Sequence, residues 1–400
     1  MADFGGDVDT FRTEARAWLE ENFPKSLRRD EELDWETAMV ADKPTDDAKL
    51  WKQRIVAKGW GTPTWPKEYG GGGLSQPEAR VLQQEMARVG ADNPIQGMGS
   101  GMFGHTLLEY GTEAQKLRHL IPISRGEQRW CQGYSEPGAG SDLASLQTKC
   151  EDKGDHWEIN GQKIWTSGAQ YADWCFCLVR TDPKAKKHEG ISFVLIHMHQ
   201  PGVETRPIRL IAGSSPFCET FFTAARAAKD DMVGPLNGGW TVGKRLLQHE
   251  RSGQGNMRGA VSVSISDIAK KYVGVDEQGR LADSDLRSRL AKHMIDAKAH
   301  TLTLQRAVAE ARGNLNPSAT TSVMKNSGTW VGQERAELTL EIMGAQGLGW
   351  DGDDFTKDER AAVRSWLSGK ATTIFGGSQE IQSNIVSKRI LGLPDTTQAT

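Results

Sequence analysis

Apolar residues recur at helical spacing over roughly the first 122 positions of the chain. The first such stripe follows Asp9-Thr10, which we expect to form the N-terminal cap of a helix. A stretch rich in glycine and proline, 61–73, interrupts this helical pattern and is expected to be a loop. Residues 1–123 are therefore predicted to form an N-terminal helical domain, with further helices at 46–58, 76–89 and 98–110.

The pattern changes between residues 124 and 235, where short apolar runs are rich in aromatic and β-branched residues. The runs 174–179 and 191–196 are the clearest of them. Several short strands at such spacing predict a central β domain, a small sandwich or barrel, over 124–235. Turn signals separate the runs, at Asn160-Gly161, Thr181-Asp182-Pro183 and Gln200-Pro201-Gly202.

Helical spacing returns at Gly239-Trp240 and continues toward the C-terminus. Amphipathic segments joined by short loops predict a helix bundle over 236–400. The order helix, sheet, helix indicates an α+β fold, and the lack of a visible βαβ unit argues against a Rossmann dehydrogenase. The expected helices of the bundle cover 241–272, 284–312, 318–343, 357–373 and 378–390.

Composition narrows the class of protein. The chain has 400 residues, 25% of them charged, and a mean hydropathy of -0.54. No apolar run approaches the ~18 residues of a membrane span, and no signal peptide is visible, so a cytoplasmic location is expected. The net charge of -3 without blocks of like charge gives no support for nucleic-acid binding. The five cysteines form no CxxC pair, and we expect buried hydrophobic residues rather than metal ligands or redox groups.

The most informative stretch is the glycine-rich segment 133–142. Its three small residues, Gly138-Ala139-Gly140, let a backbone approach a ligand closely, and their N–H groups can face an anion. Ser135 and Ser141 add hydroxyl donors that can reach a flavin ring edge or a pyrophosphate. Taken alone, this stretch is also compatible with a tight surface turn.

A second stretch, 159–168, is expected to be a hairpin that leads into a strand. Trp165 supplies a flat apolar wall for an isoalloxazine ring, and the hydroxyls of Thr166 and Ser167 can bond the polar edge of that ring. By itself, a buried tryptophan after an Asn-Gly turn is usually a core residue.

Together these two stretches resemble the acyl-CoA dehydrogenase family, and the resemblance extends across essentially the whole chain. Residues 65–71 look like the family's loop before its third helix, and 374–382 resemble its C-terminal active-site turn. Tyr134 stands where a smaller aliphatic residue is usual. The resemblance implies a helical N-terminal domain, a central β domain and a C-terminal four-helix bundle. It also implies FAD bound partly across a subunit interface, usually in a tetramer.

The resemblance further implies which residues hold FAD. Those expected near the flavin ring are Gln132, Tyr134, Ser135, Trp165, Thr166 and Ser167, with Ser141 near the pyrophosphate or the CoA part of the substrate. Additional cofactor contacts are implied for Gly140, for Gly344, Gln346 and Gly347, and for Phe375, Ser378 and Glu380.

The reaction of this family needs a carboxylate that removes the α-proton of the substrate while the β-hydrogen leaves as hydride. In many members that carboxylate lies in the C-terminal turn, where this chain has Gly376. A second arrangement places it on the first long helix of the bundle, where Glu250 stands. Glu250 shares a helical stripe with Leu246 and Leu247, where desolvation by bound substrate would raise its pKa. From spacing alone, a salt-bridged glutamate at the edge of the stripe is the alternative.

The same resemblance assigns two supporting groups. Arg251 is expected to orient or screen the base, and the Gly376 N–H to donate to the thioester carbonyl. Two stretches depart from the family: 270–276 lacks its arginine signature, and 341–347 changes its Gln-x-x-Gly-Gly element. Both fall on the cross-subunit side of the cofactor, which leaves room for a heterotetramer with a related chain as well as for a homotetramer.

The resemblance implies an acyl-CoA substrate and an electron-transferring flavoprotein as electron acceptor. An acyl-CoA oxidase on the same scaffold is one alternative, and a structural subunit of a heteromeric enzyme is another. The Gly-Gly-Ser turn at 376–378 is typical of members that act on branched, cyclic or steroid side-chain thioesters. A bulky acyl group is therefore our hypothesis for the substrate.

Overall fold

The computed structural model describes residues 8–28, 44–254, 264–311 and 318–394, with the side chains of 250–254, 308–311 and 318–320 left aside. The chain divides into two compact units. The first, which we call the sheet unit, comprises Met1–Arg209 and Ser215–Val261. The second, the helical unit, comprises Leu210–Ser214 and Ser262–Thr400.

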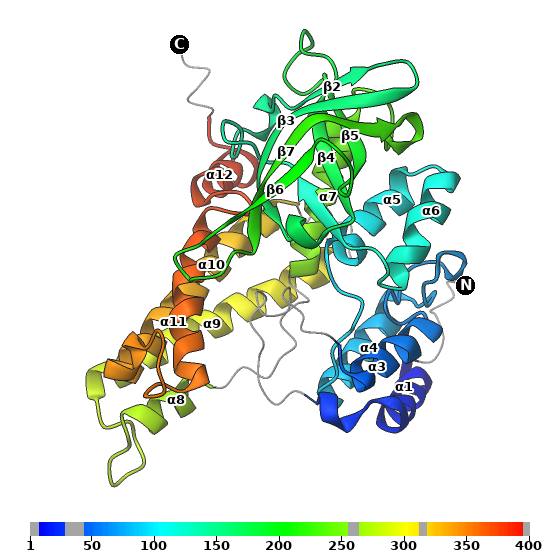
Figure 1. The fold of residues 1–400 in the computed structure, drawn as a ribbon. Coiled ribbons are helices and arrows are strands. Elements are labelled where there is room, and N and C mark those ends of the chain that lie inside the picture. The colour runs from blue at the N-terminus through cyan, green and yellow to red at the C-terminus, as the bar shows by residue number, and fades with distance from the viewer. Residues whose placement is uncertain (1–7, 29–43, 255–263, 312–317, 395–400) are drawn as a thin grey trace. The chain divides into compact units, whose positions relative to one another are not determined.

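The N-terminal part of the sheet unit is helical, as predicted (Figure 1). The predictions at 46–58 and 76–89 are confirmed, and a capping box of Ser75 and Glu78 starts the second of these helices. The cap predicted at Asp9-Thr10 is wrong, because both residues already lie in the first turn of the first helix. The helices are α1 (Val8–Asn22), α3 (Asp46–Ala57), α4 (Gln76–Val89), α5 (Gly104–Tyr110) after a π-helical turn (Gly99–Phe103), and α6 (Glu113–Ser124).

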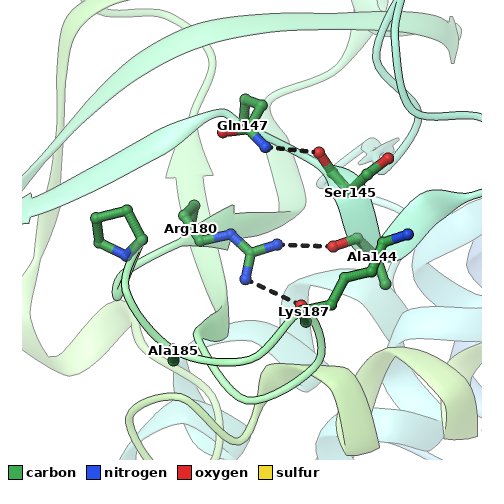
Figure 2. A pocket seen from close by; sticks show the side chains of 7 residues that line it. Ala144, Ser145, Gln147, Arg180, Ala185 and Lys187 are labelled. Carbon is green, nitrogen blue, oxygen red and sulfur yellow. Dashed lines mark hydrogen bonds between the residues drawn. The ribbon is translucent and has the colours of Figure 1, made fainter.

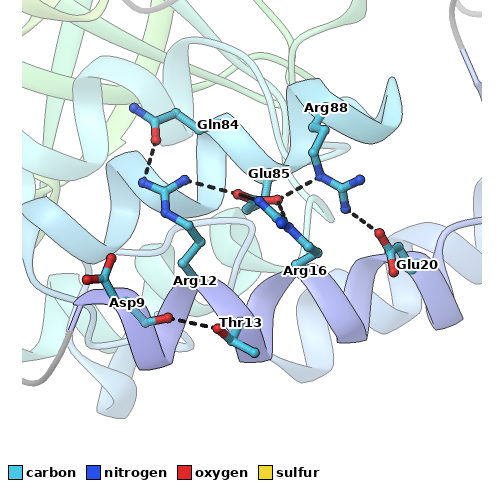
Figure 3. A network of polar contacts seen from close by, with 8 residues as sticks. All are labelled: Asp9, Arg12, Thr13, Arg16, Glu20, Gln84, Glu85 and Arg88. Atoms are coloured by element: carbon cyan, nitrogen blue, oxygen red, sulfur yellow. Dashed lines mark hydrogen bonds and ion pairs between the residues drawn. The ribbon is translucent and has the colours of Figure 1, made fainter.

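A buried carboxylate joins α1 to α4 (Figure 3). Glu85 of α4 accepts hydrogen bonds from Arg12 at 3.0 Å and from Arg16 at 2.9 Å, both on α1. Arg88, one turn further along α4, donates to the same carboxylate at 2.8 Å. Three guanidinium groups thus compensate one buried charge and fix how the two helices pack.

The predicted β domain is a single seven-stranded sheet that curls on itself (Figure 1). The strand order is β1-β4-β2-β3-β7-β6, and β5 pairs with β4. Most neighbours are antiparallel, whereas β1 and β2 run parallel to β4. The strands are β1 (Trp130–Gly133), β2 (Lys149–Asp152), β3 (His156–Ser167), β4 (Trp174–Arg180), β5 (Ile191–His197), β6 (Val203–Ile208) and β7 (Phe217–Ala228).

The hairpin turn predicted at Asn160-Gly161 is wrong, because both residues lie inside the long strand β3. The pairing of β3 with β7 is irregular there, and the Asn160 side chain accepts a hydrogen bond from the Ala224 N–H at 2.7 Å. A Cβ at Gly161 would come within 2.7 Å of the Thr148 Cα. The Asn-Gly pair therefore serves a β-bulge with a close backbone approach, which uses the same residue types as a turn.

Two apolar clusters of the sheet unit contribute to its core. In one, Phe103 from the π-helical turn stacks on Phe176 of β4, with ring centroids 5.4 Å apart, and Leu246 of α7 (Gly239–Gln254) joins them. The other includes the five cysteines, which are all buried and unbridged, as expected from the sequence.

The helical unit contains the long helices predicted for the C-terminal bundle. Its central helix, α10, contacts α8, α9, α11 and α12. The prediction of one helix over 241–272 is wrong, because Ser264 is not helical and caps a separate helix, α8, while α7 ends at Gln254 within the described residues. Residues 255–263 lie outside the described residues. The helices are α8 (Ile265–Tyr272), α9 (Ser284–Ala311), α10 (Ser318–Met343), α11 (Lys357–Gly369) and α12 (Gln379–Ile385), with short 3-10 turns at Gly344–Leu348 and Lys370–Thr373.

Candidate active site

The glycine-rich loop after β1 is fastened to β3 over its first half. The Ile164 N–H donates to the Ser135 carbonyl at 2.9 Å. The Lys163 ammonium, buried in the sheet unit, donates to the Tyr134 carbonyl at 3.0 Å. The two stretches that the sequence singled out are therefore neighbours in space.

The tip of this loop is a tight turn with open space around its glycines. The Glu136 N–H donates to the Ala139 carbonyl at 3.1 Å, and the Ala139 N–H donates back to Glu136 at 3.0 Å. The Ala139 N–H is thus used inside the turn, which corrects the expectation that three successive N–H groups face a ligand. A Cβ at Gly138 or Gly140 would meet nothing within 4 Å, so a ligand can approach the backbone there.

Trp165 has an unusual conformation for a strand residue. Its φ is 60°, in the left-handed region, and the pairing of β3 with β7 is irregular between Lys163 and Thr166. Trp165 is 52% exposed, and its indole packs in a T-shaped arrangement against the Phe217 ring, at 6.1 Å between centroids. A strained, half-exposed tryptophan is not a core residue, and such outliers are found at functional sites.

The other residues of this region differ in burial. Thr166 is fully buried, and its hydroxyl has no hydrogen-bond partner within the described part of the chain. Tyr134 is also buried, with its ring edge on Phe176 at 6.2 Å. Gln132, Ser135 and Ser167 are half-buried, and Gly140 and Ser141 are exposed.

A small open pocket lies just beyond the loop (Figure 2). Arg180 spans it and donates to the carbonyls of Ala144 at 2.7 Å and Lys187 at 3.0 Å. Burial lowers the pKa of this guanidinium from its usual value. Lys187 pairs with Asp142 at the end of the glycine-rich loop. The pocket, of about 230 Å³, is lined by Ala144, Ser145, Gln147, Arg180, Pro183, Ala185 and Lys187.

Helix α7 carries the predicted base. Glu250 and Arg251 lie in its helical backbone, and their side chains fall outside the described residues. Gly243 and Leu246 are buried and Leu247 is half-buried, so the predicted stripe faces the core over its described part.

A polar cluster that the sequence did not reveal lies beside α7. Glu109 of α5 accepts two hydrogen bonds from Arg245, and His249 lies 3.1 Å from the same carboxylate. The Arg245 hydrogen bond lowers the pKa of Glu109 despite burial. The His105 ring stacks on that of His249, and burial together with the His249 charge lowers the His105 pKa to about 4. Spacing along one helix cannot reveal such a cluster, because its members come from two helices far apart in sequence.

The helical unit carries two further groups of predicted residues, one directly after α10 and the other beside the first half of that helix. Gly344, Gln346 and Gly347 lie in the 3-10 turn directly after Met343. The turn with Phe375, Gly376, Ser378 and Glu380 lies near Asn326, which donates to the Gln379 carbonyl at 3.4 Å. Asn326 and Met343 are about 17 residues apart, or about 25 Å along a helix. One chain therefore does not bring these two groups together.

The C-terminal turn itself is well defined. Gly376 and Gly377 have φ values of 66° and 88°, which favour glycine. The Gln382 side chain donates to the Gly376 carbonyl at 3.0 Å, and Ser378 caps α12. Phe375 is half-exposed.

The described residues lack two kinds of feature, a membrane-spanning helix and a cluster of metal ligands. They contain no helix long and apolar enough to cross a membrane. Within the same ranges, no group of three or more His, Cys, Asp or Glu side chains is arranged to hold a metal ion.

Comparison with known proteins places the whole chain in one family. The N-terminal, middle and C-terminal domain models of acyl-CoA dehydrogenases match residues 7–127, 131–225 and 237–391. Acyl-CoA dehydrogenase IpdE1 of Mycobacterium tuberculosis is 35% identical over 398 residues, covering 97% of this chain and 98% of that protein.

Solved structures agree with this placement. A structure described as the Tcur3481-Tcur3483 steroid ACAD matches with a TM-score of 0.78 and 29% identity, over 97% of this chain and 98% of that one. The ChsE4-ChsE5 complex from Mycobacterium tuberculosis matches with a TM-score of 0.74 and 28% identity, over 99% and 100%. The predicted fold, with helical terminal parts around a central sheet, is confirmed. This chain belongs to the acyl-CoA dehydrogenase family and is an oxidoreductase that acts on acyl-CoA.

Proposed function

We propose that the chain uses FAD to oxidise a bulky acyl-CoA between its α and β carbons, giving the trans-2-enoyl-CoA. The observation that carries this proposal is the strained, half-exposed indole of Trp165 beside the glycine-rich loop. A strained, half-exposed indole does not stabilise a packed core, whereas it offers a flat apolar surface against which a ring-shaped ligand can pack.

The residues of the sheet unit fit a flavin. The glycines at 138 and 140 leave space for a ligand, and the buried Thr166 hydroxyl has no hydrogen-bond partner among the described residues. A polar ring edge would satisfy that hydroxyl, since buried polar groups are normally hydrogen-bonded. We expect Gln132, Tyr134, Ser135, Trp165, Thr166 and Ser167 to surround the ring, with Gly140 and Ser141 nearer the pyrophosphate or CoA.

The protein's own groups would supply the proton chemistry. Glu250 removes the α-proton of the substrate, and Arg251 orients or screens the carboxylate. The Gly376 N–H donates to the thioester carbonyl and stabilises the enolate-like charge that develops. FAD held at this loop would supply the acceptor for the β-hydrogen, which would leave as hydride, so that the substrate would lose one proton and one hydride and gain a C=C bond. An electron-transferring flavoprotein then takes up the electrons.

The pocket at Arg180 and Lys187 is our candidate for the anionic end of CoA. It adjoins Ser141 and Asp142 at the end of the loop, and both of its cationic side chains come from the sheet unit. Arg180 donates its hydrogen bonds to main-chain carbonyls. It is therefore expected to shape the pocket and to add positive charge there rather than to bind a phosphate directly.

The site is proposed to be completed by another subunit. Gly344, Gln346 and Gly347 lie about 25 Å from the turn with Phe375, Ser378 and Glu380 along α10, so one cofactor is expected to use these groups from different chains. The helical unit also exposes large apolar side chains, including Ile295, Trp330 and Leu348. The ChsE4-ChsE5 match is to a complex of two different chains. A tetramer is therefore expected, either of this chain alone or with a related one.

The substrate class is proposed from the Gly-Gly-Ser turn at 376–378 and from the steroid ACAD among the similar structures. Both favour a branched, cyclic or steroid side-chain thioester. Preference for straight medium-chain acyl-CoA, with no gain from ring-bearing ones, would contradict this part of the proposal.

A visible spectrum tests the proposed function directly. Purified protein, together with any chain that co-purifies, is expected to be yellow and to lose its flavin absorbance when a ring-bearing acyl-CoA is added without oxygen. Admission of oxygen distinguishes an oxidase, which would release peroxide at each turnover. A colourless chain, still without flavin after incubation with FAD, would point to a structural subunit instead.

A further inference from the structure

A buried ion pair links the glycine-rich loop to β3. Lys163 is 0% exposed, and its ammonium donates to the Glu136 carboxylate at 2.8 Å and to the Tyr134 carbonyl at 3.0 Å. Glu136 also accepts the N–H groups of Thr148 at 2.9 Å and Gln147 at 2.6 Å. One pair of side chains therefore ties together three segments of the sheet unit.

Glu136 is charged in this setting. Burial opposes ionisation, but the Lys163 charge and the hydrogen bonds outweigh it and lower the Glu136 pKa. A buried ion pair contributes little net stability relative to apolar residues of similar volume, because both charges lose their hydration. Stability alone therefore does not account for this pair. Its directional hydrogen bonds suggest a role in positioning the loop.

The geometry of the peptide bond shows what is positioned. In a planar trans peptide the C=O of one residue and the N–H of the next point in opposite directions. The Tyr134 carbonyl points toward the buried Lys163 ammonium, to which it is hydrogen-bonded. The Ser135 N–H of the same peptide therefore points away from Lys163. That N–H has no acceptor among the residues the structure describes, while the Ser135 carbonyl is used by Ile164.

The same lysine lies two residues before Trp165. The Lys163 side chain is anchored at both Glu136 and Tyr134, directly before the irregular pairing in which Trp165 adopts a φ of 60°. An anchored neighbour helps to hold a strained residue, because such conformations persist only where the surroundings over-determine them.

We propose that Lys163 and Glu136 are positioning residues for FAD. They aim the Ser135 N–H at the flavin and hold Trp165 as its wall, without touching the substrate. This inference rests on the proposed function, in which FAD binds at this loop.

The test compares a charge-neutral double variant with the wild type. Lys163→Met with Glu136→Gln removes both charges, keeps an acceptor for the Thr148 N–H and leaves no buried charge uncompensated, so the fold is expected to survive. Lys153→Met is the matched control, because Lys153 forms an exposed ion pair with Glu151 beside the same strands. Each apoprotein is titrated with FAD by fluorescence quenching, and thermal unfolding without FAD is followed in parallel.

The double variant is expected to unfold near the wild-type temperature but to bind FAD about tenfold or more weakly, as loss of one well-directed hydrogen bond implies. The control should bind FAD as the wild type does. Wild-type FAD affinity in a folded double variant would overturn the inference while leaving the proposed function intact. If the wild type itself binds no FAD and is not bleached by acyl-CoA, the proposed function and this inference both fail.

Discussion

Arg245 of α7 donates two hydrogen bonds to the Glu109 carboxylate of α5, from Nε at 2.7 Å and from Nη2 at 2.8 Å. His249, one helical turn further on, lies 3.1 Å from the same carboxylate. One acidic side chain therefore holds two successive turns of α7, up to the residue before Glu250. Because Glu250 shares this turn, the rotation of α7 about its axis decides where that side chain points.

Replacement of Glu109 by glutamine should slow flavin reduction by about tenfold, since small misplacements of a catalytic group are costly. FAD affinity should not change, because the hydrogen bonds of Glu109 are to Arg245 and His249 of α7 and not to the residues proposed to hold the cofactor. Anaerobic stopped-flow measurement of flavin bleaching gives the rate. Glu20→Gln, which breaks an exposed ion pair with Arg88, is the control. An unchanged rate in Glu109→Gln would show that α7 is positioned without this contact.

Glu250→Gln should abolish flavin reduction by substrate while FAD stays bound. The amide keeps the size of the carboxylate but cannot accept the α-proton. The flavin spectrum before and after anaerobic addition of acyl-CoA gives both readouts in one sample. Bleaching at the wild-type rate would refute the assignment of Glu250 as the base.

Trp165→Gly should weaken FAD binding by about tenfold without lowering the free energy of unfolding of the apoprotein. Glycine adopts a positive φ without strain, and the indole it replaces is half-exposed, so stability loses little. Ala224→Gly is a matched control, because Ala224 is exposed with a φ of 53° and lies outside the predicted site. A fall in stability with intact FAD binding would assign Trp165 to the core instead.

Glu85 should make the stability of the wild type depend on pH in acid. The Arg16 hydrogen bond is the largest cause that lowers its pKa, from 4.5 to about 2. A carboxyl with a depressed folded-state pKa contributes stability above its unfolded pKa, and this contribution is lost as pH falls through the folded value. We expect a loss on the order of 2 kcal/mol between pH 5 and pH 2, because Arg12 and Arg16 are partly exposed and screened.

The comparison that isolates this effect is Glu85→Gln, which has no titrating group at that position. Chemical unfolding at several pH values should show a smaller acid-dependent loss in the variant than in the wild type. Equal slopes for the two proteins would mean that the cluster of Figure 3 does not govern acid stability.

Much of the fold could be predicted because its signals are local. Helix α4 begins with the Ser75–Glu78 capping box, and the predicted bounds of α4 and α10 both match the structure. Asn160-Gly161 misled the prediction, since the residues that suit a hairpin turn also suit a bulge in β3. The cap at Asp9-Thr10 failed for a similar reason, because acidic and hydroxyl residues also favour the first turn of a helix.

The sequence by itself determined the order of helical and β parts, the family resemblance and the identity of the candidate residues, since these depend on residue type and spacing along one segment. Only the tertiary structure decided which of them meet. It joined the loop to β3 through Lys163 and Glu136, turned Trp165 outward and placed Gly344 about 25 Å along α10 from the turn with Phe375. Such relationships depend on contacts between segments distant in the chain, on which local periodicity carries no information.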